Sequence, residues 1–112
     1  MIRVKVKRNS SGKPTRVEVK GHALFAPPGN DIVCAGVSML TQTVIFALED
    51  LVKLKLPVII KEGCLLISTP PGMERKKADK YFLLIETMLL GLQEAARSYP
   101  AHLVYYEEKS AP

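Results

Sequence analysis

The sequence contains only two cysteines, Cys34 and Cys64, which lie thirty positions apart. This spacing excludes the dense cysteine framework of a small secreted domain and the Cys-x-x-Cys pair of a redox protein. The first ten residues, MIRVKVKRNS, lack the unbroken apolar stretch of a secretory signal because charges interrupt them at every second position. The sequence therefore predicts reduced thiols and a cytoplasmic location.

Glycine and proline, at seven and eight residues, are too few for a fibrous or low-complexity chain, and there is no internal repeat. The chain also lacks the Gly-rich phosphate loop, the HExxH motif and the GxSxG motif. With 112 residues, of which 47% are hydrophobic, it has the size and apolar content of a single globular domain covering residues 1–112.

Acidic residues are scarce near the N-terminus. The net charge of the chain is +5, and residues 1–20 account for more than all of it, with seven lysines and arginines against Glu18 alone. Such a basic segment is typical of either a solvated sheet face or a surface that favours RNA-rich surroundings.

No charged residue occurs from Ile32 to Leu48, a run of 17 residues that reaches the lower limit for crossing a bilayer. Polar side chains in the middle of the run and acidic residues at both ends favour a buried helix of a soluble domain, with no membrane involved. Such a helix needs cover on several sides, and a homodimer is one way to supply it.

Hydrophobic periodicity predicts seven elements in the order ββαββαβ. The expected elements are strands at 2–7 and 16–20, a loop at 21–30, a helix at 32–54, a hairpin of strands at 58–60 and 65–67, a helix with an apolar stripe over 81–96, and a strand at 103–106. This order predicts an α+β fold, in which a mostly antiparallel sheet has two helices packed on it.

His22 and Cys34 are the strongest candidates for chemistry. His22 follows the second expected strand, and Cys34 lies in the first turn of the helix expected after the N-cap residue Asp31. The positive end of the helix dipole favours an anionic sulfur there, and an imidazole brought back by the loop would complete a cysteine nucleophile. Asp31 is also placed to orient His22, and Ser38 shares the helix face of Cys34 one turn later.

Simpler interpretations stand beside these. Cysteine is often a core residue, a lone histidine is often only hydrogen-bonded, and Asp31 and Ser38 also fit a cap and a packing residue. Cys64, in an apolar strand, is expected in the core, and His102 on the surface. A zinc site at the helix start lacks the paired ligand spacing of structural zinc, so neither a metal nor a cofactor is expected.

The segments Gly21-His22-Ala23 and Gly29-Asn30-Asp31-Ile32-Val33-Cys34-Ala35-Gly36-Val37-Ser38 resemble the GHA…GxDIVCAAVS pattern of the ribosomal-processing cysteine protease Prp family. The similarity continues through Thr41-Gln42-Thr43, Leu90-Gly91-Leu92 and Tyr99-Pro100, and so covers nearly the whole chain. The chain departs from the pattern at Gly36, where alanine is usual, and in the loop at Leu24 and Pro27-Pro28.

The resemblance implies a cysteine endopeptidase that removes a short apolar and aromatic N-terminal extension from a protein of the large ribosomal subunit. It implies His22 as the general base, Cys34 as the nucleophile, a ribosomal protein precursor as the partner, and a homodimer.

The loop residues Gly21, Leu24, Phe25 and Gly29 are candidates for contact with the extension. The alternative is a non-catalytic ribosome- or RNA-binding module that uses the basic N-terminal hairpin, with Tyr105 and Tyr106 as stacking groups.

Overall fold

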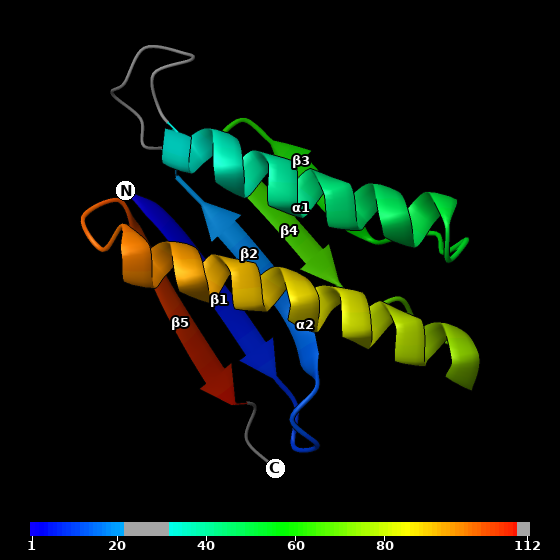
Figure 1. The fold of residues 1–112 in the computed structure, drawn as a ribbon. Helices are drawn as coiled ribbons and strands as arrows, with labels where there is room; N and C mark the ends of the chain where they lie inside the picture. Colours follow the sequence, from blue (N-terminus) through cyan, green and yellow to red (C-terminus); the bar gives the residue numbers. More distant parts are fainter. Residues whose placement is uncertain (22–31, 110–112) are drawn as a thin grey trace.

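A computed structural model describes residues 1–21 and 32–109, which form a five-stranded sheet with two helices on one of its faces (Figure 1). The elements have the predicted order ββαββαβ, and the α+β class is confirmed. Their bounds are β1 Ile2–Arg8, β2 Pro14–Lys20, α1 Ile32–Asp50, β3 Val58–Lys61, β4 Cys64–Ser68, α2 Arg75–Ser98 and β5 Leu103–Lys109.

The strands lie in the order β3-β4-β2-β1-β5 across the sheet. All neighbouring strands pair antiparallel except β1 and β5, which are parallel. A parallel pair needs a crossover connection, and here the intervening elements, ending with α2, supply it. The sheet is therefore mixed but mostly antiparallel, as the sequence predicts.

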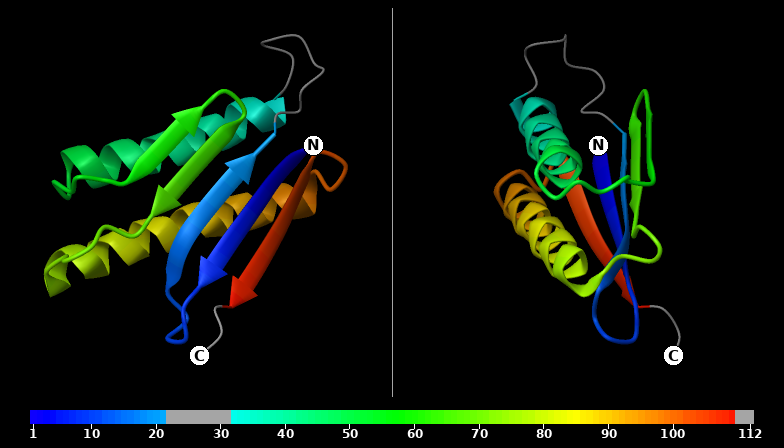
Figure 2. Two further views of the ribbon diagram at one scale, coloured as in Figure 1. Left: turned by 180° about the vertical axis from the view of Figure 1, so that it is seen from behind. Right: turned by 90° about the vertical axis from the view of Figure 1, so that its right-hand side faces the viewer.

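The core lies between the sheet and the layer formed by the two helices (Figure 2). Alternate residues of each central strand are buried, which is the period-two pattern expected when one sheet face is covered. The most completely buried core side chains are Ile2, Val4, Val6, Val17, Ile67 and Leu103 from the sheet, and Leu48, Tyr81, Ile85, Met88, Leu89 and Leu92 from the helices.

The predicted end of the first helix at residue 54 is wrong, because α1 ends at Asp50. Lys53 has a φ of 64°, and the backbone N–H of Leu54 donates back to the carbonyl of Leu48 over 3.0 Å. A left-handed residue just past a helix reverses the chain and satisfies the last carbonyls, so the helix cannot continue to Leu54.

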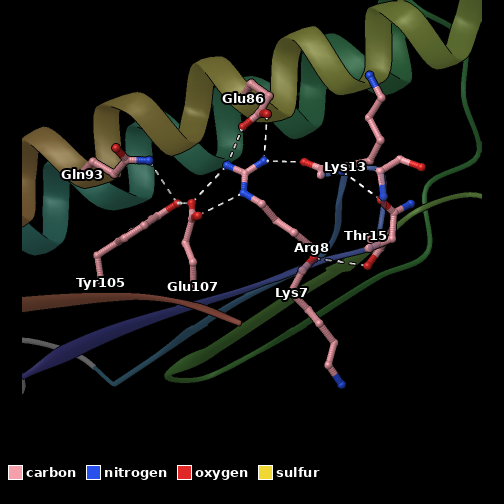
Figure 3. A network of polar contacts seen from close by, with 11 residues as sticks. Lys7, Arg8, Lys13, Thr15, Glu86, Gln93, Tyr105 and Glu107 are labelled. Carbon is pink, nitrogen blue, oxygen red and sulfur yellow. Dashed lines mark hydrogen bonds and ion pairs between the residues drawn. The ribbon is translucent and has the colours of Figure 1, made fainter. Parts of the chain in front are cut away.

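A polar network at the inner side of the sheet joins β1, β5 and α2 (Figure 3). The guanidinium of Arg8 donates to both carboxylate oxygens of Glu86 at 2.8 and 2.9 Å, and to both of Glu107 at 3.0 Å. The Tyr105 hydroxyl donates to Glu107 over 2.7 Å and accepts from Gln93 over 3.1 Å. Hydrogen bonds from Arg8, and then from Tyr105, lower the pKa of Glu107.

Substituting Arg8 with alanine is expected to lower the free energy of unfolding by about 2–4 kcal/mol. The Arg8 side chain is only 15% exposed and serves two carboxylates, which would lose their bidentate partner. Lys5→Ala is the matched control, since the Lys5–Glu108 ion pair at 3.2 Å is about half exposed on both sides and should contribute less than about 1 kcal/mol. Urea unfolding of both variants measures the difference, and equal losses would contradict the role given to Arg8.

The same network sets an acid limit for the wild type. The pKa of Glu107 in the folded protein lies below the ordinary value of 4.5. The contribution of Glu107 to the free energy of unfolding is therefore present above pH 4.5 and is lost as the pH falls through the folded pKa. Urea unfolding between pH 3 and pH 6 should show this loss for the wild type, and a smaller one for Glu107→Gln.

Candidate active site

A pocket of about 210 Å³ lies where α1 begins, between that helix and one end of the sheet. The strands contribute apolar side chains to its wall, and α1 contributes Cys34 together with polar side chains. The lining residues are Ile2, Val19, Gly21, Cys34, Val37, Ser38, Thr41, Gln42 and residues 60–65.

Cys34 is the third residue of α1 and is half-buried at this pocket. Its neighbours Val33 and Val37 are buried in the core and fix the rotation of the first helical turns. The first turn of a helix has backbone N–H groups that make no bond within the helix, so the thiol lies among donors suited to an anion.

Two hydroxyl side chains of α1 line the pocket beyond Cys34. Ser38 follows one turn later, lines the same pocket as Cys34 and is exposed. The hydroxyl of Thr41 is buried and donates to the carbonyl of Val37 over 2.9 Å, so its donor is satisfied by the helix itself. Ser38 is therefore the hydroxyl on this wall better placed to meet a ligand.

Gly21 brings the end of β2 to the pocket. Its φ is +86°, a conformation that side chains with a Cβ rarely adopt, and an added Cβ would overlap the carbonyl oxygen of Met1. The backbone N–H of Gly21 donates to the carbonyl of Gly63 over 2.9 Å, which ties it to the turn between β3 and β4. The residue bonded to His22 is thus fixed on the pocket that contains Cys34.

The turn between β3 and β4 forms a wall that sequence reasoning missed. Ile60, Lys61 and Glu62 line the pocket, although they lie about forty positions from Gly21 along the chain. The pairing of β2 with β4, in which Lys20 lies opposite Cys64, brings them there. Only this long-range strand pairing places the turn beside Gly21, and no local pattern in the sequence signals it.

The structure brings together Gly21, Cys34 and Ser38 of the predicted site residues. The predicted base His22, the predicted orienting residue Asp31, and the loop residues Leu24, Phe25 and Gly29 lie outside the described residues. Among residues 1–21 and 32–109, no group of three His, Cys, Asp or Glu side chains is placed to hold a metal ion.

The expectation that Cys64 is a core residue is wrong. It is half-buried and lies opposite Lys20 and Lys61, on the sheet face away from the helices. The reason is the period of two, because the next residue, Leu65, and then Ile67 take the core-facing positions of β4. His102 is exposed, as predicted, and the two cysteines do not form a disulfide.

A cysteine in the first turn of a helix, at a pocket, is typical of enzymes that use a thiol. Comparison with known proteins shows which class of thiol enzyme this is. The model of the family described as cysteine protease Prp matches residues 1–104. The chain therefore belongs to the cysteine protease Prp family, and the predicted protease activity is confirmed.

Three relatives are informative. The ribosomal processing cysteine protease Prp of Bacillus subtilis (strain 168) is 30% identical over 105 residues, which cover 92% of this chain and 94% of the relative. The crystal structure of SMU.848 from Streptococcus mutans is 32% identical with a TM-score of 0.85, over 98% of this chain and 96% of that one. The essential ribosomal processing protease Prp from S. aureus, in complex with a covalently linked product peptide, is 28% identical with a TM-score of 0.84, over 96% of this chain and 100% of that one.

These matches decide between the two functions that the sequence left open. The chain is a cysteine protease of a family that processes ribosomal protein, so the non-catalytic binding module is excluded as its class. The basic N-terminal hairpin is not explained by protease chemistry.

Proposed function

We propose that this protease removes a short apolar and aromatic N-terminal extension from a protein of the large ribosomal subunit, with Cys34 as nucleophile and His22 as general base. The observation that carries the proposal is the placement of Cys34 in the first turn of α1, on the pocket that Gly21 also lines. His22 is the next residue along the chain from Gly21, so the proposed base is covalently attached to a residue that lines the same pocket as Cys34.

The chemistry follows from these two groups. His22 takes the thiol proton, and the Cys34 sulfur attacks the scissile carbonyl to form a tetrahedral oxyanion. Backbone N–H groups in the first turn of α1 are the donors for that oxyanion. The imidazolium then gives the proton to the leaving amine, and water hydrolyses the remaining thioester. The S. aureus protein with its covalently linked product peptide supports a covalent step of this kind.

The pocket supports an apolar extension as the substrate. Its walls include Ile2, Val19, Val37 and Ile60, so they favour an apolar or aromatic side chain. Ile60 belongs to β3, which is an edge strand of the described sheet. An extended peptide beside this edge gains backbone hydrogen bonds while one of its side chains enters the pocket. A ribosomal substrate also supports the cytoplasm as the site of action.

Selective labelling tests the assignment of the nucleophile. We expect Cys34 to react with iodoacetamide at least about tenfold faster than Cys64, because the proposed base His22 takes the thiol proton of Cys34 as its sulfur attacks. Both cysteines are half-buried, so access alone does not decide the order. Mass mapping of the labelled peptides at short times measures the two rates. His22→Ala should slow the labelling of Cys34 only, and faster labelling of Cys64 in the wild type would contradict the assignment.

The outer side of the helix layer supports the proposed homodimer. Ile32, Met39 and Phe46 recur every seven residues along α1, and Leu83 and Leu90 do so along α2, and all five are exposed. α1 is also the one helix in the described chain that is long and apolar enough to span a membrane, yet its other face packs on the sheet. Contact with a second copy covers these side chains without a membrane.

Replacing both Met39 and Phe46 with lysine is therefore expected to weaken dimerisation by at least about a hundredfold. These side chains are 71% and 58% exposed in one chain, so the variant should keep its fold. Ile59→Lys is the control, because Ile59 is 50% exposed but lies on the opposite face of the sheet. Sedimentation equilibrium measures the association. A monomeric wild type at micromolar concentration, or equal weakening by Ile59→Lys, would contradict this interface.

A further inference from the structure

The face of the sheet turned away from the helices is strongly basic. Strand register assigns residues to this outer face, because directly paired residues lie on the same side of a sheet. It contains six cations and two carboxylates: Arg3, Lys5, Lys7, Arg16, Lys20 and Lys61, with Glu18 and Glu108. Figure 3 shows the contrast at one strand end, where Arg8 points toward α2 and Lys7 points away from it.

The carboxylates of this face leave half of its cations unpaired. Glu108 pairs with Lys5 at 3.2 Å, and Glu18 pairs with Lys20 at 3.4 Å and Arg16 at 3.8 Å. Arg3, Lys7 and Lys61 form no ion pair with any residue of the described ranges. Three cations are therefore available to an external anion.

Strand register places opposite charges together at two positions of this face, Lys5 with Glu18 and Lys7 with Glu108, and like charges together at two others. Arg3 lies directly opposite Lys20, and Lys7 lies directly opposite Arg16, in the pairing of β1 with β2. Like charges in directly opposite positions destabilise a sheet, and this pair of strands has two such positions. Anions bound between the strands would remove the repulsion at both.

The spacing of the cations fits a chain of repeated anions better than a single one. Arg3, Lys5 and Lys7 alternate along β1, which separates them by about 7 Å each, and neighbouring strands add rows about 5 Å away. Nucleic acid has a regularly repeated phosphate charge that such a ladder can neutralise at several points.

An aromatic side chain on the same face indicates single-stranded nucleic acid. Tyr106 is 45% exposed and lies opposite Lys5 in the pairing of β1 with β5. Aromatic rings beside cations stack the unpaired bases of single strands. Tyr105, the other predicted stacking group, instead binds Gln93 and Glu107 on the inner side.

We propose that the outer face of the sheet binds single-stranded RNA, with Arg3 and Lys7 on the phosphates and Tyr106 against a base. Lys5 and Arg16, whose side chains are half-exposed, exchange their carboxylate partners for two further phosphates. This second site lies on the face opposite the helices, so it does not depend on which residues cleave peptide. It gives the protease a means of holding ribosomal RNA while the pocket at the start of α1 stays open to a peptide.

The test is fluorescence anisotropy of a labelled, unstructured 12-nucleotide RNA titrated with the full chain at several salt concentrations. The wild type should bind with a log–log salt slope of about −3, as expected for about four phosphates on a single strand. Arg3→Glu combined with Lys7→Glu should reduce affinity at least about tenfold and the slope by about 1.4. Tyr106→Ala should weaken RNA binding about tenfold while leaving the slope unchanged.

The charge-reversal variant also has a built-in check of folding. It converts both like-charge pairs between β1 and β2 into opposite-charge pairs, but it also puts a carboxylate opposite Glu108 in the pairing of β1 with β5. These effects oppose one another, so its thermal midpoint should change little, and cleavage of a short leader peptide should be unchanged. Lys76→Glu combined with Lys80→Glu, on exposed positions of α2, makes the same change in net charge away from this face. RNA binding that both double variants reduce equally, or that polyglutamate matches in affinity, would overturn the proposal, as would no salt-dependent binding by the wild type.

Discussion

Alanine in place of Cys34 is expected to lower kcat/KM for a leader peptide by about a thousandfold or more, because the variant lacks the sulfur at the helix start that attacks the scissile carbonyl. The side chain is half-buried and alanine is smaller, so the fold should survive and the thermal midpoint should change little. Peptide binding should also persist, since the apolar walls of the pocket are untouched. A continuous assay with a fluorogenic leader peptide, together with thermal unfolding of the same samples, measures both quantities.

His22→Ala should lose as much activity as Cys34→Ala, because the two groups act as a unit and their effects do not add. Cys64→Ala is the matched thiol control. Cys64 also borders the pocket, but its strand register places it on the sheet face away from the helices, so this variant should keep most of its activity. Ser38→Ala tests the neighbouring hydroxyl on the same pocket wall, and a change of only a few-fold is expected if Ser38 merely packs against the peptide. Cleavage by Cys34→Ala at the wild-type rate would end the assignment.

Asp31→Ala separates two roles for that residue. Loss of a helix cap lowers stability by about 1 kcal/mol and changes turnover little. Loss of a group that orients His22 lowers turnover without that change in stability. Measuring both on one sample distinguishes them.

Gly21→Ala should produce the second large effect, and it acts on both fold and activity. The left-handed φ of +86° costs an alanine about 1–2 kcal/mol, and relieving the overlap of its Cβ with the Met1 carbonyl costs about 1–3 kcal/mol more. The backbone hydrogen bond from Gly21 to Gly63 is then strained or lost, so residue 21 shifts, and His22, which is bonded to it, shifts as well. Since a misplacement of about 1 Å can reduce turnover a hundredfold, we expect about that loss in kcat at temperatures where the variant is folded.

Gly72→Ala is the control for this effect. Gly72 has a similar φ of +68° but nothing within 4 Å of an added Cβ, so it tests the backbone strain without the overlap. It lies between β4 and α2, away from the pocket, and should lose about 1–2 kcal/mol of stability with no change in turnover. Equal effects of the two substitutions on turnover would contradict the role proposed for Gly21 beside His22.

The order and type of every element could be predicted from the sequence because each has a local signal. Alternation in β1 and β2, the apolar stripes of the helices and the glycine turn before β4 are all short-range patterns. The predicted element bounds were wrong where an element begins or ends for a reason other than its hydrophobic pattern. The end of α1 depends on the left-handed Lys53, and the polar first turns of α2 give no apolar stripe to detect.

The site was predictable only in part, for the same reason. The residues GHA and DIVC lie close together in sequence, and the helix start places Cys34 without any long-range information. The wall made by Ile60, Lys61 and Glu62 depends on the pairing of β2 with β4, and the outward position of Cys64 depends on the register of that pair. Strand register between distant segments is not set by local pattern, so neither feature could be predicted from the sequence.

The mass of a ribosomal protein tests the central claim most directly. A large-subunit ribosomal protein that carries its N-terminal extension is incubated with the wild type and with Cys34→Ala, and the intact mass of each product is measured over time. The account predicts that the wild type shortens the protein by a single cut after the apolar and aromatic extension, and that Cys34→Ala leaves its mass unchanged. An unprocessed precursor with the wild type, or the same cut made by Cys34→Ala, would contradict it.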